Sequence, residues 1–328
     1  MSNLEHDRIR YPVTRFVIKK FVLGKVPEVD ITRAEYARIK KSWNMILYVL
    51  RLESIADFLI RSYEELEHEC LRIALKASIS HDFDWQEIID ETHTVDRRIF
   101  NLLASSKAYI DKARSLTKKI GGLSLLEELD AVRGEQFDKN FSYRLLEYLR
   151  NHSQHAGTTT DALFRYSGME EVPESDSEFS DTRFVFVARP KLNINGLLDS
   201  RQLKPQLRSE LLEKSDKGGR IDLLPHVRKY VSCLGVIHER MRNHIVAEAE
   251  LAWDNIHEII DRYIAIHGKD TVGLCAVALG DGFIASDKVP LFSQPYDRIK
   301  KLNKRNVHIS KIHKWIVSSE LPVRERKK

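Results

Sequence analysis

The sequence predicts a mainly α-helical protein with a small β segment near its middle. Three observations support this fold class. Apolar residues recur every three or four positions over long stretches, Gly and Pro are scarce at 14 and 9 of 328 residues, and hydrophobic and charged residues make up 42% and 31% of the chain. The spacing is typical of helices that bury one face, and the composition is typical of a globular protein with a substantial core.

Two helical stretches follow an N-terminal extension over residues 1–30. Residues 31–78 keep the helical spacing without a Gly or Pro, which indicates one long helix or two nearly collinear helices. Residues 84–122 form a second stretch, in which Lys residues are followed by Gly121 and Gly122. This is the usual composition of a helix C-terminus.

A third helix is expected over residues 137–157, followed by a short helical turn in 158–166, where Thr and Asp residues could act as caps. Residues 167–182 are acidic, polar and without periodicity, which indicates a loop. The alternating, aromatic segment 183–194 is the best strand candidate.

The C-terminal half is expected to hold one long helix over residues 221–268. Its apolar positions follow a nearly heptad spacing that His238 and Glu248 interrupt. This heptad face should therefore pack along another helix, of the same chain or of a partner. Residues 297–328 carry eleven Lys and Arg against three Asp and Glu. Such a basic tail suits phosphate binding, and a merely solvated terminus is an equal alternative.

Four consecutive parts are thus expected: the extension (1–30), a helical core (31–166), an acidic loop with a short β segment (167–200) and a C-terminal helical region with a basic tail (201–328). No apolar run approaches the roughly 20 residues that span a bilayer, and the N-terminus lacks the apolar core of a signal peptide. The three Cys residues are widely spaced, without a CxxC motif. We therefore expect a cytoplasmic protein with buried reduced thiols, no membrane segment, no metal site and no cofactor.

The segment EYLRNHSQHAG, residues 147–157, is the candidate active site. Arg followed by His after four to six intervening residues occurs four times in the chain, about as often as chance allows. Only Arg150 and His155 combine a polar residue after the Arg, a helix end beside the His, and neighbouring Ser and Gln donors. The other three pairs lie within helices or across a helix start: Arg61 with His68, Arg220 with His226, and Arg262 with His267.

The run LRNHSQH resembles the motif of the HEPN superfamily, in which an Arg and a polar residue, often Asn, are followed after three residues by a His. The preceding helix, RRIFNLLASSKAYIDKARSL, is similar to the second core helix of that family, and the resemblance covers residues 31–166. It implies an up-and-down four-helix core that often dimerises, with the motif at the subunit junction. Active members are metal-independent ribonucleases, commonly toxins or abortive-infection effectors of antiphage defence.

Carried onto this chain, the resemblance makes Arg150, Asn151 and His155 the catalytic residues of an endoribonuclease. The residue types suit that chemistry. His can act as acid or base near neutral pH, and Arg offers planar donors to phosphate oxygens. An extra imidazole, His152, departs from the motif, and an exposed position on the helix flank is its simpler interpretation.

The family's additional acidic residue has two candidates here, Glu64 and Asp111, between which the sequence does not decide. The partners that the resemblance implies are RNA, a second copy of the chain, and an antitoxin or other regulatory protein. The alternative function is a non-catalytic, HEPN-like helical interaction or regulatory module, which would bind a partner through the heptad face of residues 221–268.

Overall fold

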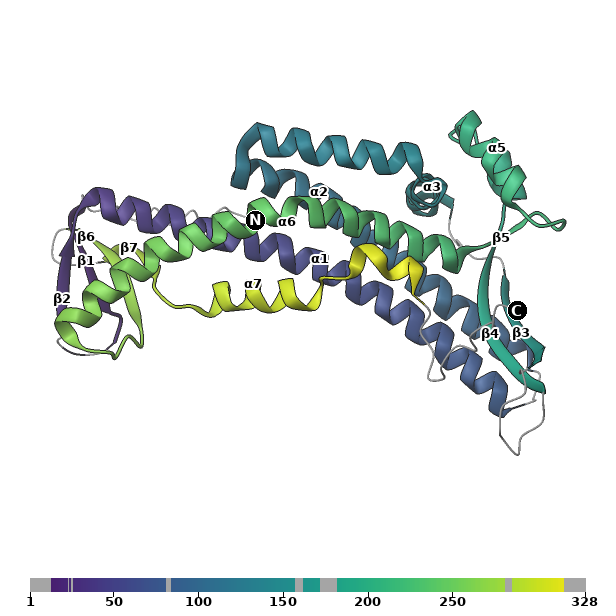
Figure 1. Ribbon diagram of the computed structural model, residues 1–328, viewed down its shortest axis with the longest axis horizontal. Coiled ribbons are helices and arrows are strands. Elements are labelled where there is room, and N and C mark those ends of the chain that lie inside the picture. Colours follow the sequence, from purple (N-terminus) through teal and green to yellow (C-terminus); the bar gives the residue numbers. More distant parts are fainter. Residues whose placement is uncertain are drawn as a thin grey trace, which may run out of the picture. The chain divides into compact units, whose positions relative to one another are not determined.

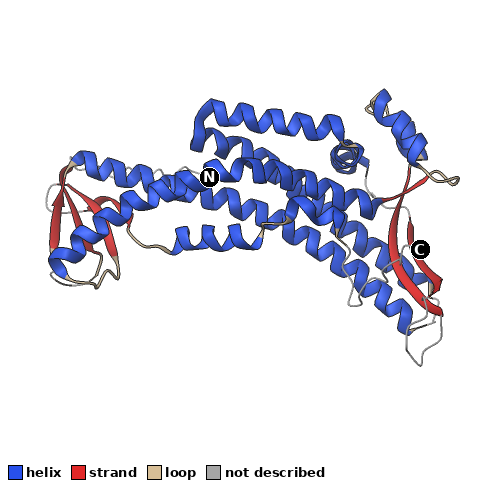
Figure 2. Ribbon diagram, in the orientation of Figure 1, coloured by secondary structure: helices blue, strands red, loops and turns tan. Residues whose placement is uncertain are grey.

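The computed structural model describes residues 13–22, 24, 26–80, 84–156, 162–171, 182–280 and 285–315. It is mainly helical with small antiparallel sheets, which confirms the expected fold class at that level (Figure 2). The helices are α1 (Arg33–Ile79), α2 (Trp85–Lys139), α3 (Phe141–Ala156), α4 (Asn195–Leu198), α5 (Pro205–Lys214), α6 (Leu223–His267), α7 (Gln294–Arg305) and the 3-10 helix η2 (Ile309–Lys314). The strands are β1 (Val13–Lys20), β2 (Glu28–Ile31), β3 (Ala162–Glu171), β4 (Thr182–Asn193), β5 (Arg220–Asp222), β6 (Leu274–Gly280) and β7 (Ala285–Pro290).

The chain forms two compact units, each assembled from separated segments. The sheet unit takes Met1–Ser54, Ser115–Leu123 and Arg242–Arg305, and the bundle unit takes Ile55–Arg114, Ser124–Met241 and Asn306–Lys328. These units differ from the four consecutive parts expected from the sequence, because the long helices α1, α2 and α6 each contribute to both. Within the described residues, none of the helices has the length and apolar character needed to cross a membrane.

Helix α1 is one continuous helix, which decides between the two predicted alternatives of one long helix and two nearly collinear helices. A capping box defines its start: the Thr32 N–H donates to Glu35 Oε2 at 2.7 Å, and the Glu35 N–H donates to Thr32 Oγ1 at 3.1 Å. These two bonds satisfy backbone donors that the first turn of a helix leaves unpaired. The start of the helix is therefore encoded locally, directly after strand β2.

Helix α2 breaks at Gly122, which has φ 73° and ψ −156°. The predicted helix end at Gly121–Gly122 is thus confirmed as a break, since a left-handed φ suits Gly. The helix resumes beyond Gly122 and runs to Lys139, which was not predicted from the sequence. The chain reverses at this break, and Figure 1 shows the two arms side by side, where Arg114 pairs with Asp130 at 2.9 Å.

In the bundle unit, α1, the arms of α2, α3 and α6 pack together. Ser62 of α1 lies 2.9 Å from Ser105 of α2, and Arg228 of α6 donates to Glu67 of α1 at 2.6 Å and 2.7 Å. Tyr230 of α6 extends this packing to α3. The predicted long helix 221–268 is confirmed as α6.

Most of the α6 heptad face lies in the chain's own interior. Nine of its positions are buried, and they are Val227, Val231, Leu234, Met241, Ile245, Ala252, Ile256, Ile259 and Tyr263. Of the two alternatives, packing within the same chain is therefore the one that holds for these nine positions.

The sheet unit contains an antiparallel sheet of order β2-β1-β6-β7. Val17 of β1 pairs with Val277 of β6, and both are fully buried. The expectation of a single β insertion is corrected here. Residues 1–30 contribute β1 and β2, and the C-terminal region contributes β6 and β7. These strand pairs form between segments near the two ends of the chain, so a local sequence pattern does not predict them.

The predicted strand at 183–194 is confirmed as β4, in a second sheet of order β3-β4-β5. The helical turn expected in 158–166 is wrong, since Ala162–Glu171 is strand β3. Strand β3 also includes the first residues of the expected acidic loop, because its register with β4 runs from Ala162↔Lys191 to Glu171↔Thr182. Most of that loop lies outside the described residues.

Candidate functional site

Helix α3 carries all three residues predicted for the active site. Its apolar side is buried in the bundle unit, with Leu145, Leu146 and Leu149 at most 1% exposed. Arg150 follows Leu149 and is itself 93% buried, since 7% of its surface is accessible, whereas Asn151 is exposed. The helix continues to Ala156, which confirms the predicted helix end near Gly157.

Arg150 is held by an ion pair within its own helix. Its Nη1 lies 2.7 Å from Oε1 of Glu147, one turn earlier, and both side chains are more than 90% buried. Its Nη2 makes a longer contact, 3.5 Å, with Oδ1 of Asn151. A buried carboxylate beside a guanidinium compensates a charge that would otherwise be costly to bury.

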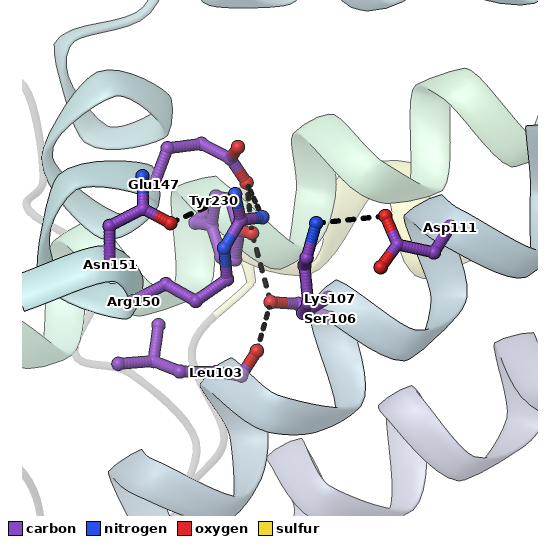
Figure 3. A network of polar contacts seen from close by, with 8 residues as sticks. All are labelled: Leu103, Ser106, Lys107, Asp111, Glu147, Arg150, Asn151 and Tyr230. Carbon is purple, nitrogen blue, oxygen red and sulfur yellow. Dashed lines mark hydrogen bonds and ion pairs between the residues drawn. The ribbon is translucent and has the colours of Figure 1, made fainter. Parts of the chain in front are cut away.

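A polar network fixes the Glu147 carboxylate (Figure 3). The single hydroxyl proton of Tyr230 is shared between Glu147 Oε1 at 2.8 Å and Ser106 Oγ at 3.0 Å, and the Ser106 hydroxyl donates to the Leu103 carbonyl at 2.7 Å. Burial, and then the Glu147 charge, raise the pKa of Tyr230 well above its ordinary value. Tyr230 is therefore a neutral donor, and the network joins α2, α3 and α6 at the candidate site.

The two carboxylates considered as the family's additional acidic residue form ion pairs within their own helices. Asp111 pairs with Lys107 at 2.9 Å on an exposed face of α2, as Figure 3 shows, and Glu64 lies 3.8 Å from Arg61 of its own helix. A carboxylate that does contact Arg150 is that of Glu147, which was not predicted as a site residue. Its spacing of three residues before the Arg was the available signal.

A cavity of about 360 Å³ opens beside Arg150 and Asn151. Its walls come from the second arm of α2, from α3, and from the start of α5 with the turn before it. The lining residues are Arg133, Phe137, Arg144, Glu147, Tyr148, Arg150, Asn151, Gln202, Lys204, Gln206 and Leu207. Four of these are cations and one is a carboxylate, so the cavity is positively charged. We call it the cationic pocket.

Arg144 ties the three walls of this pocket together. Its Nε donates to Glu210 of α5 at 3.1 Å, and its Nη2 pairs with the other oxygen of the same carboxylate. Its Nη1 donates to the carbonyl of Asp138 at 2.6 Å and to that of Phe137. A bidentate guanidinium–carboxylate pair is strong and directional. The ends of α2, α3 and α5 are therefore fixed relative to one another.

The third predicted catalytic residue, His155, is in the last turn of α3. It follows Asn151 by four residues, and residues at this spacing share one face of a regular helix. The side chains of His155 and of His152 lie outside the described residues.

The other Arg–His pairs belong to ordinary structural contacts, as their sequence context indicated. Arg262 donates to Glu35 at 2.6 Å, in the sheet unit. His226 Nδ1 lies 2.9 Å from Ser142 Oγ, and burial lowers the pKa of His226. Among the described residues, His, Cys, Asp and Glu side chains form no cluster that could hold a metal ion.

No protein-family model, no curated protein and no solved structure matches this chain.

Proposed function

We propose that the protein is a metal-independent endoribonuclease whose active site is at the C-terminal end of α3. One observation carries the proposal. Arg150 and Asn151 line a positively charged pocket, and His155 follows Asn151 by four residues in the same helix. Cleavage of a phosphodiester needs positive charge close to the phosphoryl oxygens and an acid–base group nearby, and this segment contains both residue types.

The proposed reaction is an in-line attack by the RNA 2′-hydroxyl. A base removes the 2′-hydroxyl proton, the 2′-oxygen forms a bond to phosphorus, and the bond from phosphorus to the 5′-oxygen breaks. An acid donates a proton to the departing 5′-oxygen. The products are a 2′,3′-cyclic phosphate and a 5′-hydroxyl. His155 takes the acid–base role.

Arg150 stabilises the extra negative charge on the phosphoryl oxygens, and Glu147 fixes the direction of its guanidinium. A guanidinium held in place needs little reorganisation as charge develops, which makes such stabilisation effective. Asn151, exposed beside it, positions the ribose or the Arg150 side chain.

A second copy of the chain completes the site in this proposal. One His155 per chain supplies one acid–base group, whereas the reaction uses two. A homodimer with α3 near its junction would supply the second. The packing of α1, α2, α3 and α6 is consistent with a HEPN-like core. As part of the same proposal, the protein acts on cytoplasmic RNA as a toxin or antiphage-defence effector, and an antitoxin or regulatory protein restrains it.

A non-catalytic module is the second candidate, and the burial of Arg150 favours it. An Arg that is 93% buried and paired with Glu147 could serve the fold alone. In that case the cationic pocket would bind a phosphorylated partner without cleaving it, and the buried heptad face of α6 would play no part.

The test compares RNA cleavage by three proteins in excess EDTA: the wild type, His155→Ala, and His152→Ala as the matched control. We expect His155→Ala to lose about 10²–10⁴-fold in rate, the usual contribution of a general acid or base. His152→Ala should cleave like the wild type. Equal cleavage by all three would contradict the role of His155, and cleavage that requires added Mg²⁺ would contradict the metal-independent reaction.

A further inference from the structure

The cationic pocket has more positive charge than its own carboxylates neutralise. Arg150 is paired with Glu147, and Arg144 with Glu210. Arg133 and Lys204 remain, and among the described residues neither lies within ion-pair distance of a carboxylate. Two cations that face one cavity repel each other unless an anion lies between them.

The start of α5 adds to this charge. Lys204 is the N-cap residue, and its own side chain forms no capping hydrogen bond. Pro205 has no N–H, so the first free backbone donors belong to Gln206 and Leu207, which both line the cavity. The N-terminus of a helix attracts anions through such N–H groups and its dipole.

The size and rigidity of the cavity limit what it can take. A volume of about 360 Å³ is at the lower end for small-ligand sites, which span roughly 300–1,000 Å³. It suits one nucleotide unit rather than a duplex. The Arg144 contacts fix the helix ends that form its walls, so the cavity itself is preorganised.

We propose that Arg133, Lys204 and the N-terminus of α5 form a phosphate subsite, distinct from the reacting phosphate at Arg150. In single-stranded RNA, the group bound there is a backbone phosphate next to the one that is cleaved. This last assignment rests on the proposed ribonuclease function. Phosphate binding itself does not, because it requires only the charges and donors of the pocket.

Binding is measured in the His155→Ala background, so that RNA is not consumed. Fluorescence anisotropy with a labelled single-stranded RNA hexamer gives the affinity as a function of salt. The variants Arg133→Gln and Lys204→Gln are compared with Lys139→Gln, an exposed Lys at the end of α2 that pairs with Glu135 outside the pocket. Circular dichroism checks that all four proteins are folded.

We expect each pocket variant to weaken binding about tenfold, and the slope of log K against log salt to fall by about 0.7, the value of one phosphate contact to a single strand. Lys139→Gln should bind like the parent. If both pocket variants bind like the parent, or Lys139→Gln loses as much affinity as they do, the subsite is wrong.

Competition of the labelled hexamer with longer RNA, with ADP and with inorganic phosphate identifies the source of the phosphate. Displacement of the hexamer only by longer RNA supports a backbone phosphate. Displacement by ADP at equal or lower concentration supports the same subsite but assigns it to a free nucleotide. Because His155→Ala is used throughout, phosphate binding can be established even if the wild type cleaves no RNA.

Discussion

Replacing Glu147 should destabilise the protein strongly, because its carboxylate forms an ion pair with the buried guanidinium of Arg150. The side chains of Glu147 and Arg150 are 9% and 8% exposed, and their charged atoms are 2.7 Å apart. Removing one partner of a buried pair costs about 3–5 kcal/mol, since the remaining buried charge loses its close opposite charge. Glu147→Met also takes an acceptor from Tyr230, which adds about 1 kcal/mol.

The assay is urea unfolding followed by circular dichroism, on four proteins: the wild type, Glu147→Met, Arg150→Met and the double variant. Each single variant should lose about 3–5 kcal/mol of unfolding free energy. The double variant should lose less unfolding free energy than either single variant. Two apolar side chains of similar length then replace the pair, and neither of its two charges remains buried. A control, Tyr230→Phe, should lose only about 1 kcal/mol.

Single variants whose unfolding free energy is within about 1 kcal/mol of the wild-type value would refute this reasoning, since solvent would then compensate the remaining charge. The experiment also bears on any test of catalysis. Arg150→Ala would remove the ion-pair partner of Glu147 and lower the stability of the protein. Lost activity in that variant would therefore not identify a catalytic role. Arg150→Lys keeps the charge and is the more informative replacement.

Three further predictions concern other parts of the chain. Neutralising the exposed Lys300, Lys301 and Lys304 of α7 should weaken RNA binding and lower the salt slope by up to about 2; neutralising three exposed Lys of α2 is the matching control, and an unchanged slope would count against α7. Burial lowers the pKa of His226, so the unfolded chain takes up its proton first. The contribution of neutral His226 to the unfolding free energy should be fully present above about pH 6.5. It should decline as the pH falls toward the pKa of His226 in the folded protein, and urea titrations should show that His226→Asn flattens this decline. Burial also raises the pKa of Cys70 to about 12, so its alkylation by iodoacetamide at pH 8 should be slow until urea unfolds the protein.

The long helices could be predicted from sequence because their signals are local. α1 has no Gly or Pro between its capping box and its end, and α6 repeats its apolar positions over its whole length. The sheet of β1, β2, β6 and β7 could not be predicted in the same way. Val17 pairs with Val277 across nearly the whole chain, and short strands with Lys and Asp have weak propensities of their own.

The candidate site was predictable only in part, for the same reason. Arg150 and Asn151 were singled out by their local motif, and both line the cationic pocket. Arg133 and Lys204 were missed, because they are in segments that carry no motif. The chain reversal at Gly122 brings Arg133 to α3, and the Arg144–Glu210 pair brings α5 and Lys204. These are tertiary contacts, which a local pattern does not report.

The most direct test of the proposed function is the chemistry of the RNA ends that the wild-type protein leaves in excess EDTA. Attack by the 2′-hydroxyl predicts 2′,3′-cyclic phosphate and 5′-hydroxyl ends, and no cleavage where the nucleotide before the cut has a single 2′-deoxy substitution. Products with 3′-hydroxyl and 5′-phosphate ends, or cleavage at the 2′-deoxy position, would contradict the account.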